Sequence, residues 1–408
     1  MWGVVSLLGL LAGPLAGSLV AQTIATRTLP GAVTTARQPL FSLPVAPLGF
    51  AAPGALYLGQ RNSLVSLDFL GEDRLLFTFR VPGLHLRSTA SEDGNPPDEG
   101  FQRQIRALVL QLPSGTIATE ASWAVHDRAR YLWPLANGHF LVRDGNTLSE
   151  GDASLELRPA LRFAGPLLWV QPDPEEKLLV ASSREPETAP AAEFAPNSAD
   201  ASGAAAPADI LIRILHRDTG RVMLVSRVHS LLHLGFNSIG YVEAMRTRGI
   251  GWSLILNRYA GGSQSLGQVD SVCTPQADFL TDSTALVTTC GFSGERLLQV
   301  LTTDGRTLWR DQDPVTSVWP TVVRSANGAR LAETTLQARH AISAMAPMGA
   351  DDVHAQVVRV LDAATGELLF ATTTDPVYDA GGNVALSPSG KRLAVLRHGA
   401  IEVYDLGK

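Results

Sequence analysis

The stretch NVALSPSGKRLAVLRHGAIEVYDL, from Asn383 to Leu406, decides the fold. It holds three apolar runs that are separated by Ser387-Pro388-Ser389-Gly390 and by His398-Gly399. Glycine, proline and serine favour reverse turns, because glycine accepts positive φ and proline fixes its own φ near the turn value. The stretch therefore predicts three antiparallel strands joined by two tight turns.

The same turns recur towards the N-terminus. A hairpin turn from Asp362 to Gly366 lies between the apolar runs 357–362 and 367–372, which gives the repeat "strand, Asp-x-x-Thr-Gly, strand, strand, Ser-Pro-x-Gly, strand". Turns at the position of Ser387 to Gly390, which form the first hairpin of each repeat, are found seven times, and each is followed by an apolar run. They are Gly71-Glu72-Asp73, Ala136-Asn137-Gly138, Pro172-Asp173-Pro174, Phe236-Asn237-Ser238, Thr281-Asp282-Ser283, Ala326-Asn327-Gly328 and Pro388-Ser389-Gly390. They are 36 to 65 residues apart, and the shorter spacings match a four-stranded propeller blade.

The apolar pattern favours a propeller over a sandwich. The strands predicted at 177–181 and 392–396 are apolar at successive positions after their first residues, Lys177 and Arg392, as expected for strands buried on both faces between neighbouring blades. The segment 330–346 fits less well, because it has no glycine or proline, and a short helix over Ala338 to Met345 competes with a strand there.

Composition agrees with an all-β fold. With 45% hydrophobic residues the chain is too apolar to be disordered, and 37 glycines and 25 prolines indicate many turns. A net charge of -6 provides no basic surface for phosphate, which argues against a nucleic-acid partner.

The motifs resemble those of seven-bladed β-propellers of the WD40-like, YVTN-like and quinoprotein-like group, from Leu64 to Leu406. The Trp-Asp pair of WD40 repeats is replaced by Leu361-Asp362 and Tyr404-Asp405, so the partner rules of that family do not transfer. One segment, Thr303 to Trp309, is similar to the tryptophan-docking repeat of quinoprotein propellers. The resemblance implies an all-β, seven-bladed β-propeller with four-stranded antiparallel blades.

The N-terminus completes the expected domain plan. The final blade has only three strands, which leaves a bare outer edge, and a strand from Gln38 to Val45 or from Ala55 to Gly59 is expected to close the ring. The plan is therefore a signal peptide (1–21), an N-terminal segment with the ring-closing strand (22–60) and the propeller (61–408).

The apolar run from Val4 to Val20 predicts export. It is followed by Ala21, a small residue suited to cleavage, although no Lys or Arg precedes it, and an uncleaved membrane anchor is the alternative. No Cys follows the run, which excludes a lipoprotein anchor, and no other segment is long enough to span a bilayer. We expect a periplasmic or secreted monomer.

Cys273 and Cys290 agree with an oxidising compartment. They flank a hairpin that turns at Thr281-Asp282-Ser283, so folding brings the two sulfurs together and predicts a disulfide. Two free thiols remain the alternative. A metal site is disfavoured, because neither Cys has a Cys or His two to four residues away.

The sequence contains no motif in which catalytic residues have a recognisable spacing. His229 and His233 are the one close histidine pair, and we interpret them as loop or core residues; Gly291 to Gly294 is one residue short of a nucleophile elbow and predicts a turn. The acidic pairs Glu92-Asp93, Asp98-Glu99 and Asp351-Asp352 are interpreted as solvated, and the tryptophans as packing residues. No cofactor and no metal is predicted, and any catalytic residues are unknown.

Two function classes remain. The first is an exported binding or scaffold module for a protein or a small ligand; the second is a propeller enzyme with a site in the central channel, such as a lactonase-like hydrolase or a quinoprotein-like dehydrogenase. The lack of catalytic spacing favours the first. Three insertions, Ser88 to Gly100, Glu185 to Ala208 and Arg339 to Val353, fall between second and third strands, which places all three on one face, and we hypothesise that this face holds the partner. The Ala- and Pro-rich second insertion is alternatively a disordered tether.

Overall fold

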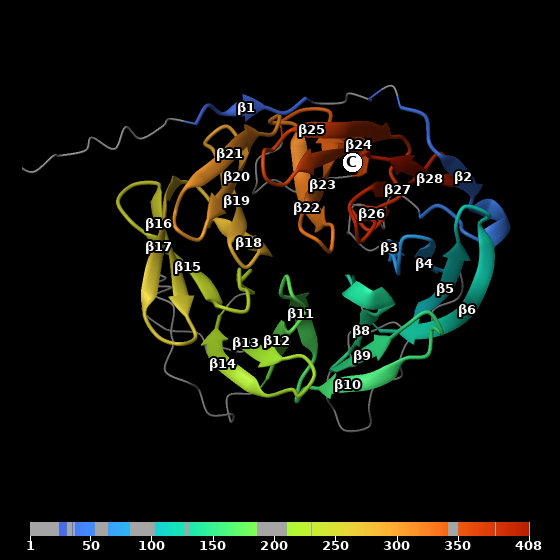
Figure 1. Cartoon of the computed structure of the whole chain (residues 1–408), viewed down its shortest axis with the longest axis horizontal. Coiled ribbons are helices and arrows are strands. Elements are labelled where there is room, and N and C mark those ends of the chain that lie inside the picture. Colours follow the sequence, from blue (N-terminus) through green and yellow to red (C-terminus); the bar gives the residue numbers. More distant parts are fainter. Residues whose placement is uncertain are drawn as a thin grey trace, which may run out of the picture.

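The strands form a seven-bladed ring (Figure 1). The computed structural model describes residues 24–30, 35, 37–53, 64–81, 103–126, 130–185, 210–229, 231–341, 350–379 and 381–407. Seven sheets follow one another in sequence order, and within the blades consecutive strands pair antiparallel. The predicted all-β, seven-bladed propeller is therefore confirmed.

The strands are as follows, from the innermost outwards. Blade 1 comprises β3 (Ser66–Phe69), β4 (Arg74–Arg80), β5 (Arg103–Gln111) and β6 (Thr116–Val125); blade 2, β7 (Leu132–Pro134), β8 (Phe140–Asp144), β9 (Thr147–Gly151) and β10 (Arg158–Arg162); blade 3, β11 (Leu167–Pro172), β12 (Leu178–Arg184), β13 (Ile210–His216) and β14 (Val222–Val228). Blade 4 comprises β15 (Gly240–Arg246), β16 (Gly251–Arg258) and β17 (Ser263–Asp270); blade 5, β18 (Gln276–Thr281), β19 (Thr284–Cys290), β20 (Arg296–Thr302) and β21 (Thr307–Gln312). Blade 6 comprises β22 (Ser317–Arg324), β23 (Arg330–Ala338), β24 (Val353–Asp362) and β25 (Leu368–Thr374); blade 7, β26 (Val384–Leu386), β27 (Arg392–Arg397), β28 (Ala400–Asp405) and β2 (Phe41–Pro44). Three short 3-10 helices, η1 (Ala46–Leu48), η2 (Ala136–Gly138) and η3 (Ala350–Asp352), and the strand β1 (Arg27–Thr28) complete the described elements.

Blade 4 has an irregular first strand. The segment 231–236 occupies that place, but it pairs with β15 only through the Phe236–Tyr241 bridge and the bond from Val242 N to Gly235 O (2.7 Å). A Cβ atom on Gly235 would lie 2.1 Å from the carbonyl oxygen of Ala277 in blade 5, so the chain needs glycine here. Glycine weakens a strand, which explains the irregular segment.

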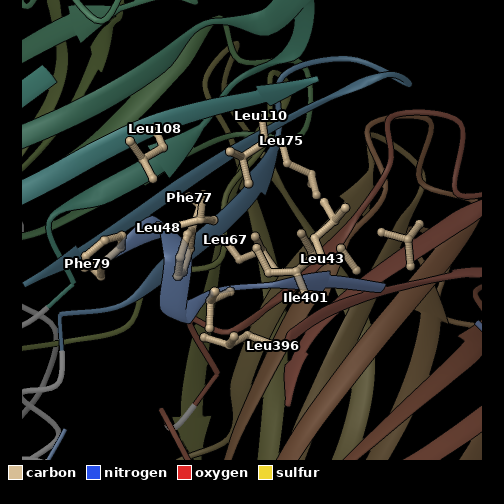
Figure 2. Close-up of a cluster of buried hydrophobic side chains, with 14 of the residues drawn as sticks. Leu43, Leu48, Leu67, Leu75, Phe77, Phe79, Leu108, Leu110, Leu396 and Ile401 are labelled. Carbon is tan, nitrogen blue, oxygen red and sulfur yellow. The ribbon is translucent and has the colours of Figure 1, made fainter. Parts of the chain in front are cut away.

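The N-terminal strand β2 closes the ring, as predicted. It pairs antiparallel with β28, from Phe41 opposite Val403 to Pro44 opposite Ala400. Its Leu43 packs between blades 7 and 1, in the cluster of buried side chains drawn in Figure 2. The alternative donor, Ala55 to Gly59, lies outside the described residues.

Upstream of β2, the chain runs along the outer edges of two more blades (Figure 1). β1 pairs in parallel with β21 and makes a fifth strand on blade 5, which the sequence did not predict. Thr35 exchanges two hydrogen bonds with Ala371 of β25 in blade 6. One N-terminal segment thus contacts blades 5, 6 and 7 in succession.

Burial along the inner strands follows the prediction. Residues 178–183 of β12 and 393–396 of β27 are all buried, because each blade packs between two others. The expected competition between helix and strand after Arg330 is resolved in favour of a strand as far as Ala338. Residues 342–349 lie outside the described part.

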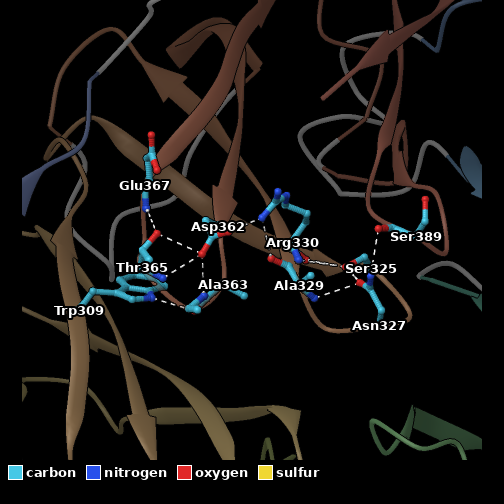
Figure 3. Close-up of polar contacts among 11 residues, drawn as sticks. Trp309, Ser325, Asn327, Ala329, Arg330, Asp362, Ala363, Thr365, Glu367 and Ser389 are labelled. Carbon is cyan, nitrogen blue, oxygen red and sulfur yellow. Dashed lines mark hydrogen bonds and ion pairs between the residues drawn. The ribbon is translucent and has the colours of Figure 1, made fainter. Parts of the chain in front are cut away.

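The repeated turn motifs owe their shape to side-chain hydrogen bonds (Figure 3). Asp362 accepts bonds from the backbone N–H groups of Ala364 and Thr365 (3.1 and 3.0 Å), and Gly366 adopts a φ of 67°. Trp309, in the segment similar to a docking repeat, is buried and donates its Nε1–H to the carbonyl of Ala363 in the next blade (2.9 Å). This tryptophan therefore joins blades 5 and 6.

Candidate functional site

The two faces of the ring differ in their connections. Because strands alternate in direction, connections from second to third strands and from blade to blade emerge on one face, which we call the loop face. The first and third hairpin turns of each blade emerge on the opposite face, which we call the turn face. The three predicted insertions start and end at β4–β5, β12–β13 and β23–β24, so their ends lie on the loop face. Most of each insertion lies outside the described residues.

Hydrogen bonds link the inner turns on the turn face from blade to blade. Asn327 of blade 6 donates its Nδ2–H to Ser389 O of blade 7 (3.0 Å, Figure 3), and the N–H of Ser389 donates to Glu72 Oε1 of blade 1 (2.7 Å). The bonds from Ala136 N to Glu176 and from Asn237 Nδ2 to Asp282 O join blades 2 to 3 and 4 to 5. These contacts join the inner turns of four of the seven pairs of neighbouring blades.

Polar side chains cross the central axis. Arg324 of blade 6 donates from Nη2 to the carbonyl oxygens of Asp173 and Pro174 in blade 3 (3.2 and 3.1 Å). Gln171 of blade 3 donates from Nε2 to Asp278 Oδ1 in blade 5 (3.0 Å). Blades 3 and 6 lie on opposite sides of the seven-bladed ring, whereas blades 3 and 5 are separated by blade 4, so both contacts join blades that are not neighbours. Burial lowers the pKa of Arg324 by more than the nearby carboxylates raise it, so the pKa lies below its usual value.

His233 joins the same group from the irregular segment of blade 4. Its Nε2 lies 2.8 Å from Asp278 Oδ1, and its ring centroid is 6.3 Å from that of Trp169. Burial lowers the pKa of His233, but the charge and hydrogen bond of Asp278 outweigh that effect, so the pKa is raised. The result is an imidazole oriented by a carboxylate, a pair suited to proton transfer.

A nucleophile for such chemistry is missing from the described residues. No hydroxyl or thiol among them is hydrogen-bonded to His233, and no group of three His, Cys, Asp or Glu residues among them is placed to hold a metal ion. His229 is exposed, and no contact in the described part joins it to His233. Sequence reasoning missed Asp278, Gln171 and Arg324; the one local signal is His233, a polar residue within the apolar run 231–234.

A second polar group lies between the inner strand of blade 1 and the connection from blade 1 to blade 2. The carboxylate of Asp68, on β3, accepts a bond from Ser66 Oγ (2.6 Å) and lies near Arg130. Burial raises the pKa of Asp68 to about 6, although Ser66 and Arg130 oppose the shift. Arg130 also lies 5.6 Å above the ring of Trp133. This carboxyl therefore titrates close to neutrality.

The cysteines lie on the loop face. Cys273, in the connection from blade 4 to blade 5, is disulfide-bonded to Cys290 at the end of β19, with their Cα atoms 5.6 Å apart. The N–H of Val272 donates to Cys290 O (2.9 Å). The turn Gly291 to Gly294 follows directly and connects β19 to β20, as predicted. The disulfide thus holds this connection and this turn together.

Exposed apolar side chains also gather on the loop face. Six of the ten exposed large hydrophobic residues in the described part lie at this face. Val81, Leu231, Val272, Phe292 and Val315 belong to its connections, and Met245 lies near the loop-face end of β15. Phe292 is the most exposed of the ten, at 79%.

Two sets of predicted features cannot be placed in the structure. The proposed signal peptide, residues 1–21, and the acidic pairs Glu92-Asp93 and Asp98-Glu99 lie outside the described residues. Within the described ones, no helix has the length and apolarity needed to cross a bilayer.

No protein-family model and no curated protein sequence matches this chain. Solved structures show distant likeness. The C-terminal WD40 domain of Sif2 is 10% identical, with 92% of this chain and 100% of that chain covered at a TM-score of 0.45. A chain of a mitotic checkpoint complex is 12% identical (95% and 100% covered, TM-score 0.47), and an oligogalacturonate lyase in complex with manganese is 12% identical (84% and 97% covered, TM-score 0.46). Such values carry no argument about function, and the propeller assignment rests on the strand order.

Proposed function

We propose that this chain is an exported, monomeric β-propeller that acts as a binding or scaffold module and holds a protein or a small ligand on its loop face. The observation that carries the proposal is the asymmetry of the two faces. Hydrogen bonds join the inner turns of the turn face at four of the seven blade junctions, whereas the loop face carries three long connections and six of the ten exposed large hydrophobic residues among those described.

The geometry of the axis supports binding over catalysis. Gln171 and His233 are both bonded to Asp278, and Arg324 is bonded across the ring to blade 3, so these side chains serve as bridges between blades. A scaffold that is fixed at its centre and carries long surface loops suits a binding surface. The disulfide and the apolar N-terminal run support export.

A matched pair of variants tests the proposal. Phe292→Ser changes the most exposed apolar residue of the loop face, and Ile117→Ser changes a residue of the turn-face end of β6 that is 43% exposed. Both are expected to fold with unchanged melting curves, since neither residue is buried. Parent and variants, immobilised, are exposed to the periplasmic and secreted fractions of the source cells, and bound proteins and small molecules are identified by mass spectrometry.

Phe292→Ser is expected to lose a species that the parent and Ile117→Ser both retain. Shortening the insertions 88–100 and 186–208 to tight turns is expected to reduce the same species. If Phe292→Ser and the shortened forms retained everything that the parent binds, the loop-face proposal would be wrong.

A further inference from the structure

A pocket lies between blades 3 and 4, away from the loop face. It has a volume of about 630 Å³ and is formed by the start of β14, the end of β16 and the start of β17. All three strand ends border the turn face, so the pocket opens at the opposite side of the ring from the insertions. Its volume falls in the range of small-molecule sites in proteins.

One part of the lining is apolar. Val222 and Met223 are exposed by 47% and 38%, although both are large hydrophobic side chains on an outer strand. The rings of Tyr241 and Tyr259 lie beside each other, with centroids 6.4 Å apart. These residues offer a surface for an apolar or aromatic body.

The charged part of the lining is cationic. Arg221 and Arg258 both border the pocket, and neither forms an ion pair with a described carboxylate. Each is instead held by a neutral neighbour or a histidine, with Arg221 Nη2 2.7 Å from His216 Nε2 and Arg258 Nη2 2.6 Å from Gln264 Oε1. Two positioned guanidinium groups without carboxylate partners favour an anion.

Tyr259 adds a hydrogen-bond donor without a partner. Its Oη is buried and has no hydrogen-bond partner within the described residues. Burial raises the pKa of Tyr259, so the hydroxyl keeps its proton at neutral pH. Buried polar groups are almost always satisfied in native proteins, and a bound acceptor would satisfy this one.

We propose that this pocket binds a small organic anion in which a carboxylate is joined to an aromatic or branched apolar body. The guanidinium groups of Arg221 and Arg258 pair with the carboxylate, and the hydroxyl of Tyr259 donates to it. The apolar body lies against Val222, Met223 and the tyrosine rings.

Binding of 2-naphthoate to the full-length protein tests the proposal, measured by isothermal titration calorimetry beside the neutral 2-naphthamide. We expect one molecule of naphthoate per chain, with the amide bound about tenfold or more weakly, since charge-assisted bonds to guanidinium are lost. Arg221→Gln and Arg258→Gln are each expected to weaken the binding of naphthoate by about tenfold, and Tyr259→Phe is expected to weaken it by roughly threefold.

Arg306→Gln provides the matched control. Arg306 follows the turn glycine Gly305 in blade 5, as Arg221 follows Gly220 in blade 3, and it lies outside the pocket. This variant is expected to bind naphthoate like the parent. Three results would each overturn the proposal: no binding of naphthoate at millimolar concentration, equal affinity for naphthoate and the amide, or an equal loss of naphthoate affinity in Arg306→Gln. None of these results bears on the proposal for the loop face.

Discussion

Replacing Leu43 by alanine tests whether the N-terminal strand holds the ring closed. Leu43 lies on β2, is 8% exposed, and packs among blade 7 residues such as Ile401 and blade 1 residues such as Leu67 (Figure 2). It also covers Gly115, where a Cβ would approach its Cδ2 to 2.7 Å. Buried leucine-to-alanine changes lower the free energy of unfolding by about 2–5 kcal/mol. Because Leu43 lies near the rim of the cluster, we expect a loss in the lower half of that range, about 2–3 kcal/mol.

Urea unfolding followed by tryptophan fluorescence measures this loss, with Leu40→Ala as the control. Leu40 is three residues upstream and 53% exposed, so its removal is expected to change the free energy of unfolding by less than about 0.5 kcal/mol. If Leu43→Ala matched the parent, or if both variants lost equal stability, β2 would not be closing the ring.

Deletion of residues 22–50 extends the same argument. It removes Leu43, Val45 and Leu48 together with the pairing of β2, a loss of about 6–9 kcal/mol at 2–3 kcal/mol for each side chain. Because domains are stable by only about 5–15 kcal/mol, the shortened chain is expected to lose its cooperative unfolding transition.

Two further measurements address the disulfide and the buried carboxyl of blade 1. The double variant Cys273→Ser/Cys290→Ser is expected to lose about 3 kcal/mol of stability, and the parent, denatured without reductant, should show no titratable thiol; a thiol signal would contradict the bond. The pKa of Asp68 is raised from 3.8 to about 6, so the native state holds a proton that the unfolded chain releases, and stability falls as the pH rises through this range. The free energy of unfolding of Asp68→Asn should therefore exceed that of the parent by roughly 2–3 kcal/mol at pH 7 but not at pH 4. An equal difference in stability at both pH values would refute the assignment.

The features predicted correctly are those with local chemistry. The turns around Asp362 and Ser389 depend on side chains that bond to their own backbone neighbours, so their residue types are visible in the sequence. The closing strand was predictable because three strands in the last blade leave an edge that needs a partner.

The contacts across the axis could not be predicted in this way. Arg324 meets Asp173, and Gln171 meets Asp278, only because closure of the ring brings the inner ends of blades that are not neighbours in sequence close together. The parallel pairing of β1 depends likewise on Arg27 reaching Asp311, a fully buried carboxylate in blade 5. A single sequence without its ring geometry does not reveal which polar residues of the inner strands meet.

The pairing of β2 with β28 also sets an order of events for the growing chain. The ribosome makes β2 before the strands of blades 1 to 6 and makes its partner β28 after them, so β2 has an unpaired edge while those blades are made. Unpaired strand edges are where chains associate wrongly, and contacts between distant parts of a chain form slowly. Ring closure is therefore a late step, and a chaperone that shields the N-terminal segment until the last blade is complete would raise the yield of folded protein.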